Sequence, residues 1–183
     1  MFDQLRPGQS YDLRMGIKTL AHSVGLLIEE GLLSGVGESI EDIADSLSAM
    51  QELDADQVRA MSFIPGSGTP MENWSSPDRR RELLSIAVMR LVFPDRLIPA
   101  SLDVDGLAGL KSRLEAGANV VTSLVPPDFG LHGVARSSLD IDNSKRSSAS
   151  AASVFRGCGL EKGSPAEYRL WIEDRQKAID RKT

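Results

Sequence analysis

The stretch LLIEEGLLSGVGESIEDIADSLSAMQELDADQVRAMSFI, from Leu26 to Ile64, places a strand, a glycine loop, a helix and a second strand in succession. The apolar run Leu26–Ser34 predicts a buried strand. Ser39 opens the helix and Asp42 stands three residues on, which is a capping-box pattern with Asp in place of Glu. Gln57–Ile64 alternates between polar and apolar residues, as a strand does. This order predicts two parallel strands joined by a crossover helix.

The same alternation of helix and strand continues on both sides of this unit. We expect a preceding helix over Ser10–Val24, with its apolar stripe turned inward: Leu13, Ile17, Leu20, Ala21 and Val24. The elements expected after the unit are a helix from Ser76-Pro77-Asp78 to Pro94, a strand over Leu97–Asp103, a helix over Leu107–Glu115 and a strand over Ala118–Val125. We expect Ile40 in the inward stripe of the central helix, and Leu84 and Leu91 in that of the next one. A final helix starts at Ser164. The fold class is therefore α/β with parallel strands.

Composition excludes several classes of function. The 183 residues carry a formal net charge of −5, and the computed pI of about 5.1 disfavours a nucleic-acid partner. The chain lacks an apolar run long enough to span a membrane, and Met1 to Ser10 do not resemble a secretory signal. We therefore expect a cytoplasmic protein without a membrane partner. Neither His22 nor His132 is assigned a role, and Cys158 is interpreted as a structural or incidental thiol.

Charged and hydroxyl side chains mark a candidate site, because parallel α/β folds bind ligands at the carboxyl ends of their strands. Arg59 stands in an otherwise apolar strand and is suited to holding a carboxylate. It could equally form a salt bridge with Glu30 or Asp103, or face outward. Ser101 and Asp103 alternate on one strand, so they share a face, and Asp103 is suited to an ammonium group. Together with Arg59 they would match a free amino acid, although Asp103 could also cap the next helix.

Two glycine-rich loops follow predicted strands. Gly35-Val36-Gly37-Glu38-Ser39 would let a ligand approach the backbone and would point a helix amino terminus at it. A plain tight turn explains the same residues, since a third glycine is missing from the dinucleotide-binding pattern. Gly66-Ser67-Gly68-Thr69 has the same two interpretations.

Four motifs in this order resemble those of a known family. They are LRPGQSYDLR (Leu5 to Arg14), LLSGVGESIEDIADSL (Leu32 to Leu47), MSFIPGSGTPM (Met61 to Met71) and ASLDVDGLAGLKSRLEAGANVVTSLVPP (Ala100 to Pro127). The succession resembles radical SAM enzymes of the biotin synthase and hydrogenase-maturase type. Within that group it is most similar to the methylornithine synthases of pyrrolysine biosynthesis, and the Ser-Leu-Asp-Val-Asp-Gly stretch is the most specific part of the likeness.

The resemblance implies a fold, a cofactor set and a reaction. The family folds as a (β/α)8 barrel and holds a 4Fe-4S cluster with a CxxxCxxC loop. It uses S-adenosylmethionine to form a 5′-deoxyadenosyl radical, which in the methylornithine synthases rearranges L-lysine into 3-methyl-D-ornithine. By resemblance, Arg14 would meet the S-adenosylmethionine carboxylate. The residues that would line its sugar and adenine are Gly35, Gly37, Glu38, Phe63, Ile64 and Pro65. The residues that would bind the amino-acid substrate are Arg59, Ser101 and Asp103, with Ser123 as a further lining candidate.

The chain departs from the family in one respect. It has no CxxxCxxC, and its single cysteine cannot supply the three thiolates that hold such a cluster. A (β/α)8 barrel also needs about 250 residues. We therefore expect residues 1–183 to form the carboxyl-terminal half of a barrel, with strands five to eight over about 10–127 and closing loops and helices over 128–183. Alone, the chain should not generate the radical.

This half-barrel interpretation implies a partner. The open edges would pair with a missing amino-terminal half or with a second copy. Two alternatives remain at this point. The chain could be part of another biotin synthase-like radical SAM enzyme, or a non-catalytic half-barrel module that binds a small molecule.

Overall fold

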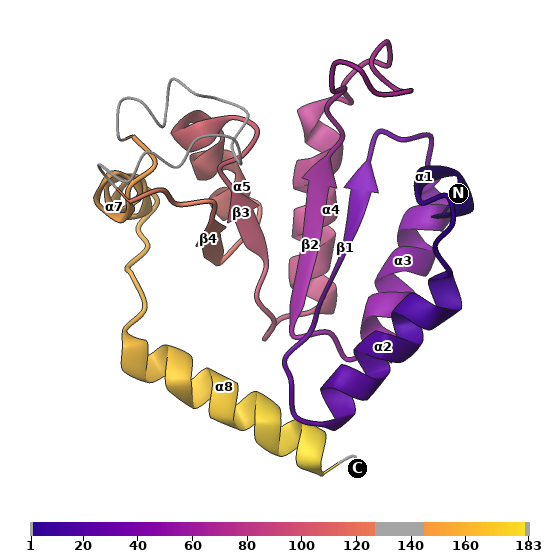
Figure 1. Ribbon diagram of the computed structural model, residues 1–183. Helices are drawn as coiled ribbons and strands as arrows, with labels where there is room; N and C mark the ends of the chain where they lie inside the picture. The colour runs from indigo at the N-terminus through magenta and orange to yellow at the C-terminus, as the bar shows by residue number, and fades with distance from the viewer. Residues whose placement is uncertain (1, 127–144, 182–183) are drawn as a thin grey trace.

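The computed structural model describes residues 2–126 and 145–181 of an α/β protein in which helices alternate with short parallel strands (Figure 1). His132 and most of the expected closing loop lie outside the described residues. The elements in chain order are α1 (Phe2–Leu5), α2 (Tyr11–Ser23), β1 (Glu29–Ser34), α3 (Ile40–Glu52), β2 (Gln57–Ser62), α4 (Arg79–Val92), β3 (Pro99–Ser101), η1 (Gly106–Gly109), α5 (Leu110–Glu115), β4 (Val120–Thr122), α7 (Ser148–Gly157) and α8 (Pro165–Asp180).

The four expected strands are confirmed, although each is shorter than the sequence predicts. β1 pairs with β2 and β3 pairs with β4, both in parallel. The two small sheets meet through the segment before β3, where Val58 donates its amide to the Leu97 carbonyl at 2.9 Å and Leu97 donates to the Asp56 carbonyl at 3.1 Å. The strands therefore follow one another in space in the order of the sequence. Among the described helices, none is long and apolar enough to cross a membrane.

The hydrophobic core lies between the strands and the helices that cover one of their faces. In β2, Val58 and Ala60 are buried and belong to the same apolar cluster as Met50 of α3 and Met89 of α4. The alternate residues of β2, among them Arg59, are only partly buried. We call the face that carries these alternate residues the open face of the sheet.

The orientation of α2 contradicts the sequence prediction. Its apolar stripe points away from the body, with Leu13, Ile17, Leu20 and Val24 between 58% and 68% exposed. The side that faces the body carries polar side chains instead. Arg14 and Lys18 lie 3.4 and 2.6 Å from the Glu30 carboxylate, and His22 Nε2 lies 3.5 Å from that of Asp56. The ion pairs of Arg14 and Lys18 with Glu30 therefore hold this side of the helix against the body.

Helix α4 shows a smaller departure of the same kind. Asp78 caps it, rather than Ser76, and the two leucines expected inside, Leu84 and Leu91, are exposed. Glu82 takes an inward position because Ser62 and Arg113 both donate hydrogen bonds to its carboxylate. The inward side of α4 also carries Ile86 and Met89, which are fully buried in the core, so the helix is turned from the expected stripe rather than reversed.

The capping box of α3 is confirmed: Asp42 donates its amide to the Ser39 side chain, and its own carboxylate accepts from the Ser39 amide. Ile40 shares the side of the helix that carries Leu47, seven residues on, but it is exposed because it stands at the first residue of α3, beyond the buried part of that side.

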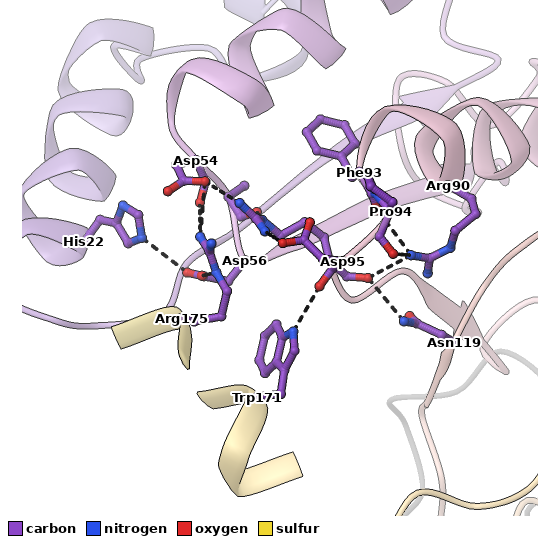
Figure 2. Close-up of polar contacts among 12 residues, drawn as sticks. His22, Asp54, Asp56, Arg90, Phe93, Pro94, Asp95, Asn119, Trp171 and Arg175 are labelled. Carbon is purple, nitrogen blue, oxygen red and sulfur yellow. Dashed lines mark hydrogen bonds and ion pairs between the residues drawn. The ribbon is translucent and has the colours of Figure 1, made fainter. Parts of the chain in front are cut away.

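The carboxyl-terminal helices differ in how well the sequence predicts them. The capping box of Ser164 and Glu167 is confirmed at the start of α8. The helix α7 was missed, because its Ser- and Ala-rich sequence lacks a strong apolar stripe. Helix α8 lies across the amino ends of β1 and β2 (Figure 1). There Arg175 reaches the carboxylate of Asp56 at 2.6 Å and the indole of Trp171 donates to the Asp95 carbonyl at 3.0 Å (Figure 2).

Candidate functional site

The carboxyl ends of β3 and β4 bring three of the expected substrate residues together. Ser101 is the last residue of β3, and Ser123 directly follows β4. The Asp103 carboxylate accepts hydrogen bonds from the Ser123 hydroxyl at 2.7 Å and the Ser101 hydroxyl at 3.1 Å. The two hydroxyls are 3.3 Å apart. The parallel pairing of the two strands thus places a carboxylate between two hydroxyl groups.

The backbone at Ser123 is strained to make this arrangement. Its φ of 63° lies in the left-handed region, which a residue with a Cβ rarely adopts. Such strain costs on the order of 1–3 kcal/mol and is typical of functional sites. The turn directs the Ser123 hydroxyl back to Asp103.

A fully buried arginine completes the group. Arg146 Nη1 lies 3.7 Å from Asp103 Oδ1, and the Arg146 carbonyl accepts from the Val125 amide at 3.0 Å, which fixes this segment beside the end of β4. Sequence reasoning missed Arg146, because it stands outside any predicted element. Asp103 Oδ1 is buried and accepts no hydrogen bond from the described residues, but the Arg146 guanidinium lies beside it as an ion-pair partner. A ligand that donates to this oxygen would share it with Arg146.

Buried ion pairs hold the turn that carries Asp103. Two residues further on, Asp105 points away from the site and pairs with Arg79 and, at 3.2 Å, with Arg113. Arg113 in turn lies 2.5 Å from Glu82 of α4, and both side chains are almost fully buried. Burial lowers the pKa of Arg79, and the neighbouring positive charge of Arg113 lowers it further. The turn is thus anchored to α4 and α5 on the side opposite the Asp103 carboxylate.

The glycine loop after β1 is closed by its own glutamate. The Glu38 carboxylate accepts from the Gly35 amide at 2.8 Å and the Val36 amide at 2.9 Å, and it lies 3.1 Å from Arg81. Burial acts to raise the pKa of Glu38, but these amides and the charge of Arg81 hold it below its ordinary value. Glu38 therefore fixes the shape of the loop, and the two amides are already engaged.

The two glycines of this loop have different surroundings. A Cβ at Gly35 would lie 2.4 Å from Cγ of Pro77, so the close approach that glycine permits is used by the protein's own chain. At Gly37, where φ is 97°, a Cβ would meet no atom within 4 Å. Gly37 therefore leaves open space beside the backbone.

Three of the residues expected to line S-adenosylmethionine share one pocket. A pocket of about 470 Å³ lies between α1, α2, α3 and the end of β1, and Arg14, Glu38 and Phe63 all line it. This volume falls within the range typical of small-molecule sites. Arg14 contributes the cation at its wall, 39% exposed and 3.4 Å from Glu30.

A second cavity of about 320 Å³ lies at the ends of β2 and β3. Phe63 and Ile64 line it together with Asp105, so Phe63 lies between the two cavities. Pro65 continues this segment and lines neither. The Phe63 amide donates to the Ser34 carbonyl at 2.8 Å, which ties the segment to the end of β1.

Arg59 is placed on the open face of the sheet but has a different partner from those expected. Its Nε lies 2.6 Å from the Glu29 carboxylate on β1, whereas the sequence suggested Glu30 or Asp103. Within residues 2–126 and 145–181, no hydrogen bond or ion pair joins Arg59 to Ser101, Asp103 or Ser123. The positive end of the expected amino-acid site is therefore neutralised by Glu29.

The donor set does not fit an iron–sulfur cluster. Cys158 is the single cysteine of the 183 residues, and the described part of the chain contains no group of three side chains suited to a metal ion. A 4Fe-4S cluster needs at least three thiolates from one protein site in this type of enzyme. The one cysteine of this chain therefore cannot supply the ligands of such a cluster.

Comparisons with known proteins agree with this arrangement. No protein-family model matches the chain. It is 42% identical over 168 residues to the 3-methylornithine synthase of Methanosarcina acetivorans, which covers 92% of this chain and 48% of that protein. The crystal structure of a methylornithine synthase (PylB) matches with a TM-score of 0.86 at 41% identity, over 93% of this chain and 51% of that one. The FeFe hydrogenase maturase subunit HydE of Thermotoga maritima is 31% identical over 121 residues, which covers 64% of this chain and 35% of that protein.

These matches and the fold place the chain among homologues of radical SAM enzymes of the biotin synthase and HydE type. Within that class, the chain is homologous to 3-methylornithine synthase over nearly its whole length. The chain spans about half the length of the curated relatives it matches, and the matched part is their carboxyl-terminal half.

Proposed function

We propose that this chain forms the substrate-binding part of a radical SAM enzyme that isomerises L-lysine to 3-methyl-D-ornithine. The observation that carries the proposal is the Asp103 carboxylate, held between two hydroxyls, with one buried oxygen left to accept a hydrogen bond. An ammonium group carries three donors and a full positive charge, which matches that acceptor. Biotin synthase-like chemistry on an apolar substrate would have little use for it.

Arg59 would bind the carboxylate end of the amino acid. Its guanidinium is already matched by Glu29, so an incoming carboxylate must share or replace that partner. Both side chains lie on the open face of the sheet and are partly exposed, so breaking their ion pair costs little free energy. Asp103 and Arg59 together would then select a zwitterion.

The pocket beside Arg14 would receive S-adenosylmethionine. Glu30 there is paired with both Lys18 and Arg14. The charged residues of the pocket wall are Arg6 and Arg14 on one hand and Glu30, Glu38 and Asp42 on the other. Burial acts to raise the pKa of Glu30, but the hydrogen bonds and charges around it, above all from Lys18, hold that pKa below its ordinary value. The half-exposed guanidinium of Arg14 would hold the carboxylate of the cofactor. Phe63, which lines the same pocket, would contact the adenine.

The four strands would correspond to strands five to eight of a (β/α)8 barrel over about residues 10–127, with residues 128–183 closing it. The likeness to methylornithine synthase over half its length supports this arrangement. Because the chain lacks cluster ligands, the radical would have to be generated by a polypeptide that carries them, and this chain alone would be inactive.

Titration calorimetry with L-lysine tests the substrate proposal. The full 183-residue chain should bind L-lysine with measurable heat. It should bind neither 6-aminohexanoate, which lacks the α-ammonium group, nor cadaverine, which lacks the carboxylate. Asp103→Asn should weaken binding by about tenfold or more, because a charge-assisted hydrogen bond contributes about 1.5–3 kcal/mol. Asp45→Asn, an exposed carboxylate on α3, is the matched control and should leave the affinity unchanged.

Two outcomes would reject this assignment. If the Asp103→Asn variant binds lysine as tightly as the unchanged chain does, Asp103 is not part of the lysine site. Absence of lysine binding together with binding of S-adenosylmethionine would favour the alternative, a half-barrel module that holds the cofactor without this substrate.

A further inference from the structure

We infer that Glu29 is a positioning residue for the substrate site: it holds the Arg59 guanidinium toward the amino ends of the strands and releases it to a ligand that brings a carboxylate. The Glu29 carboxylate is then an internal competitor of the ligand's carboxylate, and it sets how tightly Arg59 binds that ligand. This inference deepens the proposed function and rests on it, since it concerns the affinity of the same site for the amino acid.

The strand register places Glu29 on the amino-terminal side of Arg59. Gly31 on β1 is the register partner of Arg59, and Glu29 is that of Gln57, two residues earlier on β2. The Arg59 side chain therefore crosses diagonally to Glu29, where its Nε lies 2.6 Å and its Nη2 3.5 Å from the carboxylate oxygens. Because β1 has a glycine beside Arg59, no side chain of that strand separates the two groups. Two nitrogens of the guanidinium are thus turned toward the amino ends of the strands.

The other substrate residues lie in the opposite direction from Arg59. Gln57 is bridged in parallel to Leu97, so counting four residues along each strand sets Ser101 level with Met61. Met61 is also the partner of the remaining guanidinium nitrogen, since Arg59 Nη1 lies 3.9 Å from its thioether sulfur. A thioether is a weak acceptor. A carboxylate that approaches from Ser101 would therefore first meet the nitrogen with the weaker partner.

Exposure distinguishes the ion pair that can open from the one that stays closed. The side chains of Glu29 and Arg59 are 41% and 23% exposed, and exposed ion pairs contribute little stability. Arg146, the cation beside Asp103, is fully buried, and separating a buried pair is costly. Gln57 would keep Glu29 hydrogen-bonded after Arg59 leaves, because its side-chain amide donates to the same carboxylate. The carboxylate end of the substrate site is therefore the end that exchanges partners.

Titration calorimetry of the full 183-residue chain with L-lysine tests the inference. Glu29→Gln removes the competing charge and keeps the size of the side chain, so this variant should bind L-lysine about two- to fivefold more tightly than the unchanged chain. Cadaverine, which lacks the carboxylate, should bind to neither chain. Glu41→Gln, at an exposed glutamate of α3, removes the same charge away from Arg59 and should leave the affinity for L-lysine unchanged.

A double variant shows whether Glu29 acts through Arg59. Arg59→Met should weaken L-lysine binding by at least about tenfold, and adding Glu29→Gln to it should change the affinity no further. Nuclear magnetic resonance titration measures the weak binding of these two chains. It also detects the Arg59 Nε–H signal, which is identified by its absence from Arg59→Met. In the unchanged chain this signal should move when L-lysine is added, because the contact with Glu29 opens, whereas a purely structural ion pair would not respond to the ligand.

Four results would overturn this inference alone. They are L-lysine binding that Glu29→Gln leaves unchanged or weakens, a gain in affinity that persists in the Arg59→Met background, an equal gain from Glu41→Gln, and an Arg59 signal that bound L-lysine does not move. If neither the unchanged chain nor Glu29→Gln binds L-lysine, and both keep the circular dichroism of a folded protein, the proposed function fails and this inference fails with it. The two failures are therefore distinguishable.

Discussion

The guanidinium of Arg175 lies 2.6 Å from the carboxylate of Asp56, and this contact joins two residues that are 119 positions apart. Asp56 also accepts from the Ile28 amide at 2.8 Å, so one buried carboxylate ties α8 to the entry of both β1 and β2 (Figure 2). Burial acts to lower the pKa of Arg175, but the hydrogen bonds and charges of Asp56 and Asp54 raise it above its ordinary value. Helix α8 is thus fastened at the end of the strands opposite the candidate site.

Asp56→Ala should destabilise the chain strongly. It removes one partner of a buried pair and leaves Arg175 and the Ile28 amide without their acceptor, which costs about 3–5 kcal/mol. Urea unfolding followed by circular dichroism measures the loss. Asp174→Ala, an exposed carboxylate on the same helix as Arg175, should change the stability by less than about 0.5 kcal/mol. Similar stability of the two variants would contradict the fastening role.

The Glu82–Arg113 pair should behave as a coupled unit. Either single substitution, Glu82→Gln or Arg113→Met, should cost about 3–5 kcal/mol, because it leaves the other member buried without its partner. The double variant Glu82→Gln with Arg113→Met should cost less than the sum of the two singles. Additive costs in urea unfolding would show that the pair is not coupled.

Glu38 should make the stability of the chain depend on pH. Its folded-state pKa lies below the ordinary value of 4.5, so its contribution is fully present well above that pH and is lost as the pH falls through the folded value. Glu38→Gln should therefore be less stable than the unchanged chain at neutral pH, and the difference should shrink in acid. Thermal unfolding from pH 7 to pH 3 measures it. If the stability difference between the unchanged chain and Glu38→Gln grows as the pH falls, the role of Glu38 in closing the loop is contradicted.

The two capping boxes should each stabilise their helix. Ser39→Ala and Ser164→Ala remove the acceptor for the Asp42 and Glu167 amides and should cost about 0.5–2 kcal/mol each. Ser48→Ala is the matched control in the middle of α3, where the hydroxyl only donates back to the Ala44 carbonyl. It should be neutral or slightly stabilising in the same unfolding experiment, because alanine is the better helix former.

Local signals in the sequence predicted local structure well. The cap residues Ser39 and Ser164 each have a near neighbour that completes a hydrogen-bond pattern, so the start of each helix is encoded within four residues. The strand order and the grouping of Ser101 with Asp103 also follow from short-range alternation. Arg146 was missed because its partner Asp103 is 43 positions away, and nothing near Arg146 in the sequence indicates that contact.

The errors concern which side of a helix is inside. In α2 and α4 the apolar residues predicted an inward stripe, but Glu30, Asp56 and Arg113 lie where they draw charged residues inward. The periodicity of the sequence shows that a helix has an apolar side and a polar side. It does not show which of the two packs against the rest of the same chain. For α2, the ion pairs of Arg14 and Lys18 with Glu30 hold the charged face against the rest of the chain.

One measurement tests the central claim most directly. A chimera of the 3-methylornithine synthase of Methanosarcina acetivorans, in which this chain replaces the matched carboxyl-terminal half, is reconstituted with iron and sulfide and supplied anaerobically with a reductant, S-adenosylmethionine and L-lysine. The account predicts formation of 3-methylornithine by mass spectrometry, at least about tenfold less with Asp103→Asn, and an unchanged yield with Asp45→Asn. A folded, cluster-loaded chimera that cleaves S-adenosylmethionine but converts no lysine would contradict it.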